Sequence, residues 1–112
     1  MTTEALRRLT LGFESEEEKR RFEAGQMFSA AVNQVMYIVP ELPEEDMIKA
    51  LRGIGSRYSH LSGQLIREVI GQRLVQAIGT LEEYKKRDEV TDDRYLVGLT
   101  KTAGLMEKAG FF

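Results

Sequence analysis

The two prolines of this chain, Pro40 and Pro43, lie almost side by side, and the rest of the sequence contains none. Proline lacks an N–H group and clashes with the preceding helical turn, so it ends a helix or begins one. Valine, isoleucine and threonine do not form the alternating runs that indicate strands, and apolar residues recur at helical spacing instead. The sequence therefore predicts an all-α fold, a compact bundle of about four to five helices with no sheet.

We expect one domain, 1–112, because a chain of 112 residues matches the usual size of a single domain. A short N-terminal segment, 1–14, precedes helices at about 16–39, 43–54, 57–87 and 92–108. Ser15 and Glu18 have capping-box spacing at the start of the first helix, and Pro43 suits the first turn of the second. Thr91 or Asp92 can cap the last helix. The first helix also carries polar residues away from its apolar face, namely Gln26, Ser29, Asn33 and Tyr37.

The stretch GSRYSHLSGQL, residues 55–65, raises the question of whether the second and third helices are separate. Gly53 and Gly55 weaken a helix at this point, although an apolar series continues through it. Either one bent helix or two helices satisfy this pattern. We predict a break near Gly53–Ser56, with Ser56 capping the next helix. In that helix one polar face would hold Arg57, His60, Gln64 and Arg67.

Several classes of site are excluded by composition. The chain has no cysteine, which excludes disulfides, thiolate metal sites and a cysteine nucleophile. Its single histidine, His60, cannot build a multi-histidine metal site. No phosphate-binding loop, dinucleotide fingerprint or calcium loop occurs, so we expect no cofactor and no small-molecule substrate. An enzyme that uses His60 is the least expected function.

The chain shows no sign of a membrane protein. No apolar run approaches the roughly 20 residues that a membrane span needs. The first residues, MTTEALRRLTLG, lack the apolar core of a signal peptide. We expect a cytoplasmic protein without a membrane partner.

Charged residues follow two patterns. Acidic runs are followed by basic residues at the i,i+4 spacing of helix pairs, which is typical of solvated faces: Glu16–Arg20, Glu17–Arg21, Glu45–Lys49, Glu82–Lys86 and Glu83–Arg87. Between Met47 and Leu81, by contrast, five basic residues accompany one acid, Glu68, so the local charge is 5 − 1 = +4 in a chain of net charge −2. Such unpaired cations can contact phosphate. The predicted anion-binding residues are Lys49, Arg52, Arg57, His60, Gln64, Arg67 and Arg73. The alternative is that these cations pair with the acidic helices of the bundle.

Two functions follow from these patterns. The first is a non-enzymatic, small helical subunit of a larger assembly, which contacts other protein subunits and a nucleic-acid backbone, RNA included, without reading its sequence. The second is an adaptor or regulator that acts through protein contacts or homo-oligomerisation, without nucleic acid. Surplus apolar residues favour the second: Met27, Tyr37, Ile38, Val75, Ile78, Phe111 and Phe112.

Overall fold

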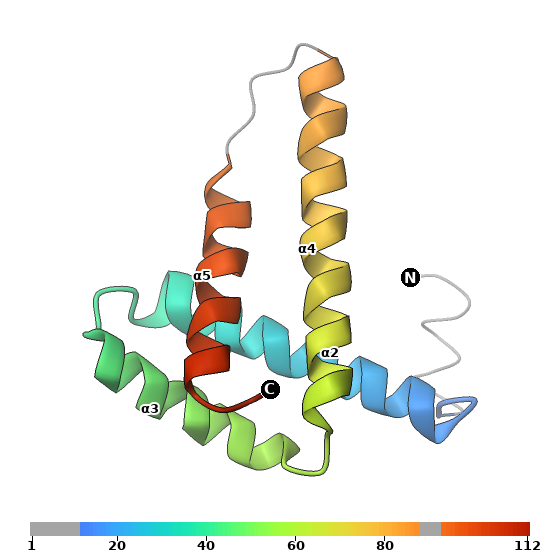
Figure 1. The fold of residues 1–112 in the computed structure, drawn as a ribbon, viewed down its shortest axis with the longest axis vertical. Helices are drawn as coiled ribbons and strands as arrows, with labels where there is room; N and C mark the ends of the chain where they lie inside the picture. Colours follow the sequence, from blue (N-terminus) through green and yellow to red (C-terminus); the bar gives the residue numbers. More distant parts are fainter. Residues whose placement is uncertain (1–11, 88–92) are drawn as a thin grey trace.

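The protein is a helical bundle, described by a computed structural model for residues 12–87 and 93–112 (Figure 1). Four α-helices and no strand occur in these residues, which confirms the predicted all-α class. The α-helices are α2 (Glu16–Asn33), α3 (Glu44–Gly55), α4 (Gly63–Lys86) and α5 (Arg94–Lys108). Two short helical turns complete the order, the π-helical η1 (Gln34–Ile38) and the 3-10 helix η2 (Ser56–Tyr58). The segment 1–11 and the proposed caps Thr91 and Asp92 lie outside the described residues.

Helix α2 is the centre of the bundle. Helices α2 and α3 form the base, and α4 and α5 stand on it as an antiparallel pair (Figure 1). Because α3, α4 and α5 all pack on α2, it is buried on more than one side, and its core residues are Ala24, Met27, Phe28, Ala31, Val32 and Val35. Met27 is completely buried, so the expectation that it belongs to the apolar surface was wrong.

The ends of α2 and the start of α3 lie near the predicted residues. The backbone N–H of Glu18 donates to Ser15 Oγ (3.1 Å), so Ser15 is the N-cap. The Glu18 carboxylate accepts from the N–H of Glu14 (3.3 Å). After η1 the chain passes Pro40, and Pro43 stands in an extended conformation just before α3 rather than inside its first turn. Proline in that position still begins the helix, because its carbonyl accepts from Met47 N–H (3.0 Å).

The predicted break near Gly53–Ser56 is present, because α3 ends at Gly55, but Ser56 is not the cap of the next helix. Helix α3 includes Gly53 and ends with Gly55, the turn η2 follows, and α4 begins at Gly63 rather than at 57. Its cap is Ser62, whose Oγ accepts from Leu65 N–H (3.2 Å). Gly55 is explained by packing, because an added Cβ would lie 2.6 Å from the ring of Phe111. The close approach of the Phe111 ring is therefore a second reason for a glycine at the end of α3.

The C-terminal segment folds back onto the base. Gly110 has a φ of +90°, and the N–H groups of Gly110 and Phe111 donate to the carbonyls of Glu107 and Met106 (both 3.1 Å). These are the two hydrogen bonds of a Schellman motif, which reverses the chain after a helix. Phe111 then packs against Gly55, and Phe112 packs against Gly63. Both phenylalanines are partly buried and belong to the core rather than to a surplus apolar surface.

Candidate binding surfaces

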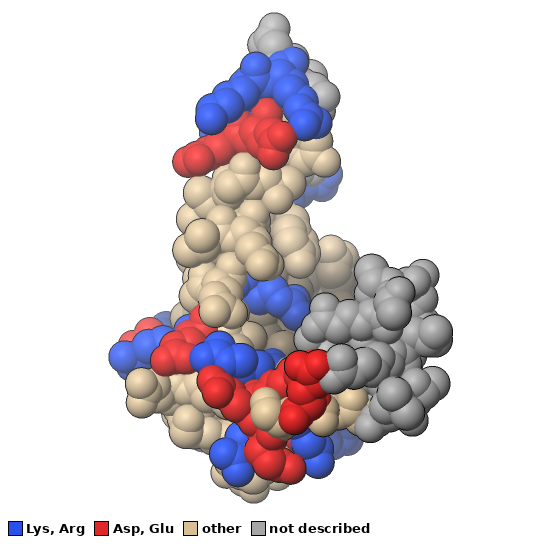
Figure 2. All heavy atoms as spheres, turned by 90° about the vertical axis from the view of Figure 1, so that its right-hand side faces the viewer, with Lys and Arg blue, Asp and Glu red and all other residues tan. Residues whose placement is uncertain are grey.

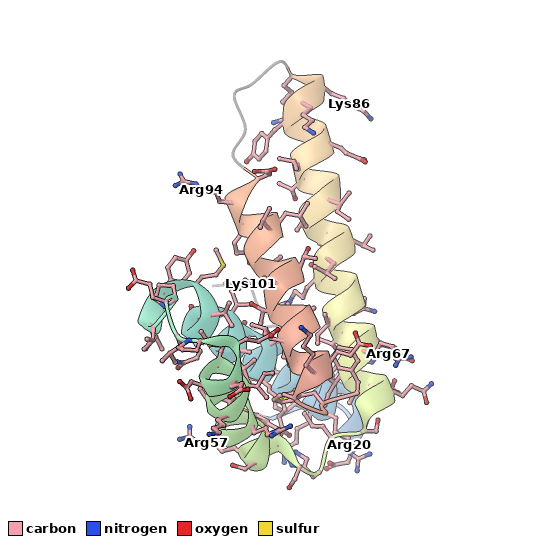
Figure 3. All side chains as sticks on the ribbon, turned by 60° about the vertical axis from the view of Figure 1, so that its left-hand side comes forward. Arg20, Arg57, Arg67, Lys86, Arg94 and Lys101 are labelled. Atoms are coloured by element: carbon pink, nitrogen blue, oxygen red, sulfur yellow. The ribbon has the colours of Figure 1, made fainter. Side chains whose placement is uncertain are left out.

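The predicted basic residues do not form one surface. Arg57 lies in η2, whereas Gln64 and Arg67 lie in α4, and the turn between them interrupts the helix face that they were predicted to share. In Figure 3, Arg57 and Arg67 project from different sides of the base. Lys49 is exposed on α3, which makes no contact with α4. The polar face predicted for Arg57, His60, Gln64 and Arg67 is therefore absent.

Two of these arginines hold the C-terminal segment. Arg52 Nε donates to the carbonyl oxygen of Ala109 (3.3 Å). The guanidinium of Arg67 lies 5.7 Å from the centre of the Phe112 ring, within the range of a cation–π interaction. Both side chains remain exposed. Their contacts stabilise the end of the chain on the base.

His60 links two parts of the base. Its Nε2 lies 2.7 Å from Oε2 of Glu23, so the turn before α4 is joined to α2. The histidine side chain is 50% exposed and the glutamate side chain 20%. Within residues 12–87 and 93–112, no serine hydroxyl is hydrogen-bonded to the imidazole. The serines that surround His60 in the sequence therefore form no catalytic arrangement with it in the described region.

Among the described residues, the predicted basic residues do not form ion pairs with the acidic helices, apart from His60. Of the seven predicted site residues, only His60 pairs with a carboxylate in the described part of the chain. The i,i+4 pairs Glu17–Arg21 and Glu83–Arg87 form, and Arg21 also bridges to Glu68 (3.1 Å). The other predicted i,i+4 pairs do not form there: Glu16–Arg20, Glu45–Lys49 and Glu82–Lys86.

Among the predicted site residues, Arg73 lines a groove on the surface of the bundle. The groove has a volume of about 920 Å³ and runs between α2 and α4. An added Cβ on Gly25 would lie 3.1 Å from Arg73 Nη2, so the glycine lets the guanidinium approach the backbone of α2. In the described region this guanidinium has neither an ion pair nor a hydrogen bond. Uncharged polar side chains also line the groove, namely Gln26, Ser29, Asn33 and Gln72. Its lining further includes the charged residues Glu17, Glu18 and Arg21 from the first turns of α2.

Two tyrosines stand on the other side of Arg73. A smaller cavity of about 130 Å³ shares Ser29, Asn33 and Arg73 with the groove and is lined by Tyr37 and Tyr95 as well. Tyr37 is 66% exposed and Tyr95 is 54% exposed. The polar row on α2 was visible in the sequence, but nothing in the sequence indicated that Tyr95 and Arg73 would meet it. The proximity of these side chains depends on the angles at which α4 and α5 cross α2.

The second candidate surface is the projecting part of α4. From Leu74 to Leu81 the helix has no charged residue, and Figure 2 shows an uncharged belt between the charged base and the charged tip. Val75 is 69% exposed and Ile78 is 43% exposed. Helix α5 covers only one side of α4, and the upper end of α4 rises beyond the first turn of α5 (Figure 1). The side with Val75 and Ile78 is therefore left open.

Other kinds of site find no support in the described residues. No group of three histidine or acidic side chains there is arranged to hold a metal ion. None of the helices of residues 12–87 and 93–112 combines the length and apolar character required to cross a bilayer.

The chain was compared with known proteins. No protein family matches it, and no significantly similar curated protein or solved structure was found.

Proposed function

We propose that the protein is a non-enzymatic helical subunit that acts through protein contacts, with the open side of α4 as its docking surface. The observation that carries this proposal is the exposure of Val75 and Ile78 within an uncharged segment, in a chain that is 30% charged. Burial of apolar surface contributes about 25 cal/mol per Å², so a partner helix that covers these residues gains stability. The cytoplasm is the proposed location, in keeping with a chain that has no cysteine.

Protein contacts are favoured over the predicted basic face for a geometric reason. A nucleic-acid backbone needs several cations in reach of one strand. Arg57 and Arg67 project from different sides, and Arg52 and Arg67 contact the C-terminal segment. The uncharged segment from Leu74 to Leu81, by contrast, is continuous along one helix.

Photo-crosslinking tests this proposal. A photoreactive phenylalanine analogue at Val75 is expected to give a discrete protein adduct in extract of the protein's own cells, because this position would be covered by the partner. The matched control carries the same group at Lys49, which is exposed on α3 away from α4. Adducts of equal yield from both positions, or none from Val75, would contradict the proposal.

A second candidate function is supported by Arg73. Within residues 12–87 and 93–112, Arg73 has no carboxylate partner. Placed between uncharged polar groups and two exposed tyrosines, it combines a phosphate contact with stacking surfaces. Proteins that bind single-stranded nucleic acid without reading its sequence use these groups, cations for the phosphates and aromatic rings for the bases. The strand would lie in the groove between α2 and α4.

Fluorescence anisotropy with labelled single-stranded RNA and DNA tests this second candidate. Arg73→Gln is expected to weaken binding about tenfold, because it removes a charge-assisted hydrogen bond. The slope of log K against log salt should fall by about 0.7 to 1. Arg57→Gln is the matched control, since Arg57 lies in η2 outside the groove. Equal effects of the two variants would exclude the groove.

A further inference from the structure

We infer that the smaller cavity beside Arg73 binds one nucleotide unit, with the phosphate on Arg73 and the base against Tyr37 and Tyr95. We call it the tyrosine cavity; its lining comes from α2, η1, α4 and α5, where α4 and α5 stand on α2 (Figure 1). Such binding goes beyond the docking surface on α4 and rests on the second candidate function, whose recognised unit it identifies. A free nucleotide and a single strand present the same phosphate and base, so both are sources of this ligand.

Arg73 provides the contact for the phosphate. Its side chain is half-buried, and within residues 12–87 and 93–112 its guanidinium forms no ion pair and no hydrogen bond. Gly25 lets the guanidinium lie against α2, since an added Cβ would be 3.1 Å from Nη2. Among the described residues that line the tyrosine cavity, Arg73 alone is charged. A guanidinium binds phosphate oxygens through two parallel N–H groups, and these donors remain available here.

The acidic residues of the larger groove lie at its other end. Glu17 and Glu18 belong to the first turn of α2. At a rise of about 1.5 Å per residue, Glu18 is about 10 Å along the helix from Gly25, the residue beside the Arg73 guanidinium. Glu17 is paired with Arg21 (3.3 Å). Because exposed charges are screened beyond about 8 Å at physiological salt, these carboxylates repel a phosphate on Arg73 only weakly.

The tyrosine cavity has the shape and lining for a flat ring. Buried apolar side chains from α2 and α5 line it, namely Phe28, Val32 and Leu99. Tyr37 and Tyr95 are both more than half exposed, so their rings are available for stacking. A cavity of about 150 Å³ holds a benzene ring. The tyrosine cavity, at about 130 Å³, therefore suits a single six-membered ring such as a pyrimidine base.

The π-helical turn η1 explains how Tyr37 reaches this cavity. Four residues recur at intervals of four along α2 and η1: Gly25, Ser29, Asn33 and Tyr37. In an α-helix each interval of four turns the row by about 40°. Turn η1 closes instead with an i→i+5 hydrogen bond, from Val39 N–H to the Gln34 oxygen (3.3 Å), so it winds less per residue. Tyr37 thus stays on the same side as Asn33, and both line the cavity.

Two polar side chains favour a base over other aromatic groups. Ser29 and Asn33 line both the tyrosine cavity and the larger groove, on the same side of α2. Hydroxyl and amide groups hydrogen-bond the polar edges of an unstacked base. The phenyl ring of a phosphotyrosine has no such edge, so it would leave these two groups without a partner. A nucleotide uses the arginine, the tyrosines and the polar pair together.

The first test is an NMR titration of the ¹⁵N-labelled full chain with uridine 5′-monophosphate, uridine and inorganic phosphate. The nucleotide is expected to shift the amide signals of Asn33, Tyr37 and Tyr95, with a dissociation constant on the order of 1 mM. Uridine and phosphate should each bind at least roughly tenfold more weakly, because each makes only half of the contacts. Unmoved signals at roughly ten times the expected dissociation constant would overturn the proposed site.

The second test uses matched substitutions. Tyr37→Ser and Tyr95→Ser should each weaken nucleotide binding about 5- to 30-fold, because each removes a stacking face. Tyr84→Ser is the control, since Tyr84 is 42% exposed near the end of α4 and lines neither cavity. Arg73→Gln should weaken binding of the nucleotide about tenfold and leave binding of uridine unchanged. Circular dichroism checks that each variant is folded. Equal losses in the three tyrosine variants would contradict stacking at this cavity.

A short single-stranded oligouridylate distinguishes the two sources. If the natural ligand is a strand, the oligonucleotide should shift the same signals and bind at least roughly tenfold more tightly than the mononucleotide. Equal affinities identify the free nucleotide as the ligand. Tighter binding of O-phosphotyrosine than of the nucleotide overturns the nucleotide as the ligand.

The tyrosine cavity and the second candidate function can fail separately. An oligonucleotide that depends on Arg73 but not on Tyr37 or Tyr95 refutes the cavity and keeps a strand in the groove between α2 and α4. If neither the oligonucleotide nor the mononucleotide shows binding that depends on Arg73, both are refuted. The docking surface on α4 is judged independently, by the crosslink at Val75.

Discussion

Replacing Phe28 with alanine is expected to lower the free energy of unfolding by about 3–5 kcal/mol. Phe28 is 1% exposed and lies in the middle of α2, the helix on which the other three pack. Its removal deletes a buried ring and leaves a cavity in the core, which the surrounding structure can fill only in part. Since domains are stable by only about 5–15 kcal/mol, this single change should bring the protein close to unfolding at room temperature.

Urea denaturation followed by circular dichroism measures this effect. The matched control is Phe22→Ala in the same helix, because Phe22 is 41% exposed and its ring packs on Phe13 at a centroid distance of 5.2 Å. The control should lose only about 1 kcal/mol, the size of an exposed aromatic contact. Losses of equal size in the two variants would show that α2 does not have Phe28 at its buried centre.

Replacing Gly98 with alanine is expected to destabilise the protein by about 1–3 kcal/mol, although alanine is the better helix former. Gly98 is buried in α5, and an added Cβ would overlap Met36 Sδ and lie 2.6 Å from its Cε. Met36 is partly buried against the core, so its side chain can move aside only by giving up packing contacts. The steric term should therefore exceed the gain in helix propensity.

Gly104 gives the matched control for Gly98. It lies in the same helix, is exposed, and has no heavy atom within 4 Å of an added Cβ. Gly104→Ala should therefore stabilise the protein by up to about 1 kcal/mol, so the two substitutions should shift the urea midpoint in opposite directions. Combining Gly98→Ala with Met36→Ala should remove the overlap, so the destabilisation of the pair should be less than the sum of the two. Additive losses would contradict a direct contact.

Local chemistry made the fold class predictable. Proline at 40 and 43 separates α2 from α3 in any arrangement, because the missing N–H and the ring clash act within one turn. Ser15 caps α2 through an N–H only three residues away. The same local reasoning placed a break near Gly55, where α3 ends, but it wrongly made Ser56 the next cap. It also missed the ring that packs against Gly55, because Phe111 lies 56 positions further along the chain.

The candidate site was less predictable than the fold. Arg73 was among the predicted anion-binding residues, but the sequence placed it on a basic face that does not exist. Its actual neighbours come from α2 and α5, so they depend on the angles at which the helices cross. Likewise, Val75 and Ile78 were recognisable as surplus apolar residues, although their exposure depends on the place where α5 begins beside α4.

There is a physical reason why the fold class follows from the sequence while the binding surfaces depend on the tertiary structure. Capping, proline geometry and apolar periodicity act over one or two helical turns, so the amino-acid order alone fixes an all-α chain and most helix ends. Contacts between residues far apart in the chain determine which cations stay unpaired and which side of α4 remains exposed. They also determine which glycine packs against an aromatic ring. Those contacts exist only once α3, α4 and α5 have packed on α2.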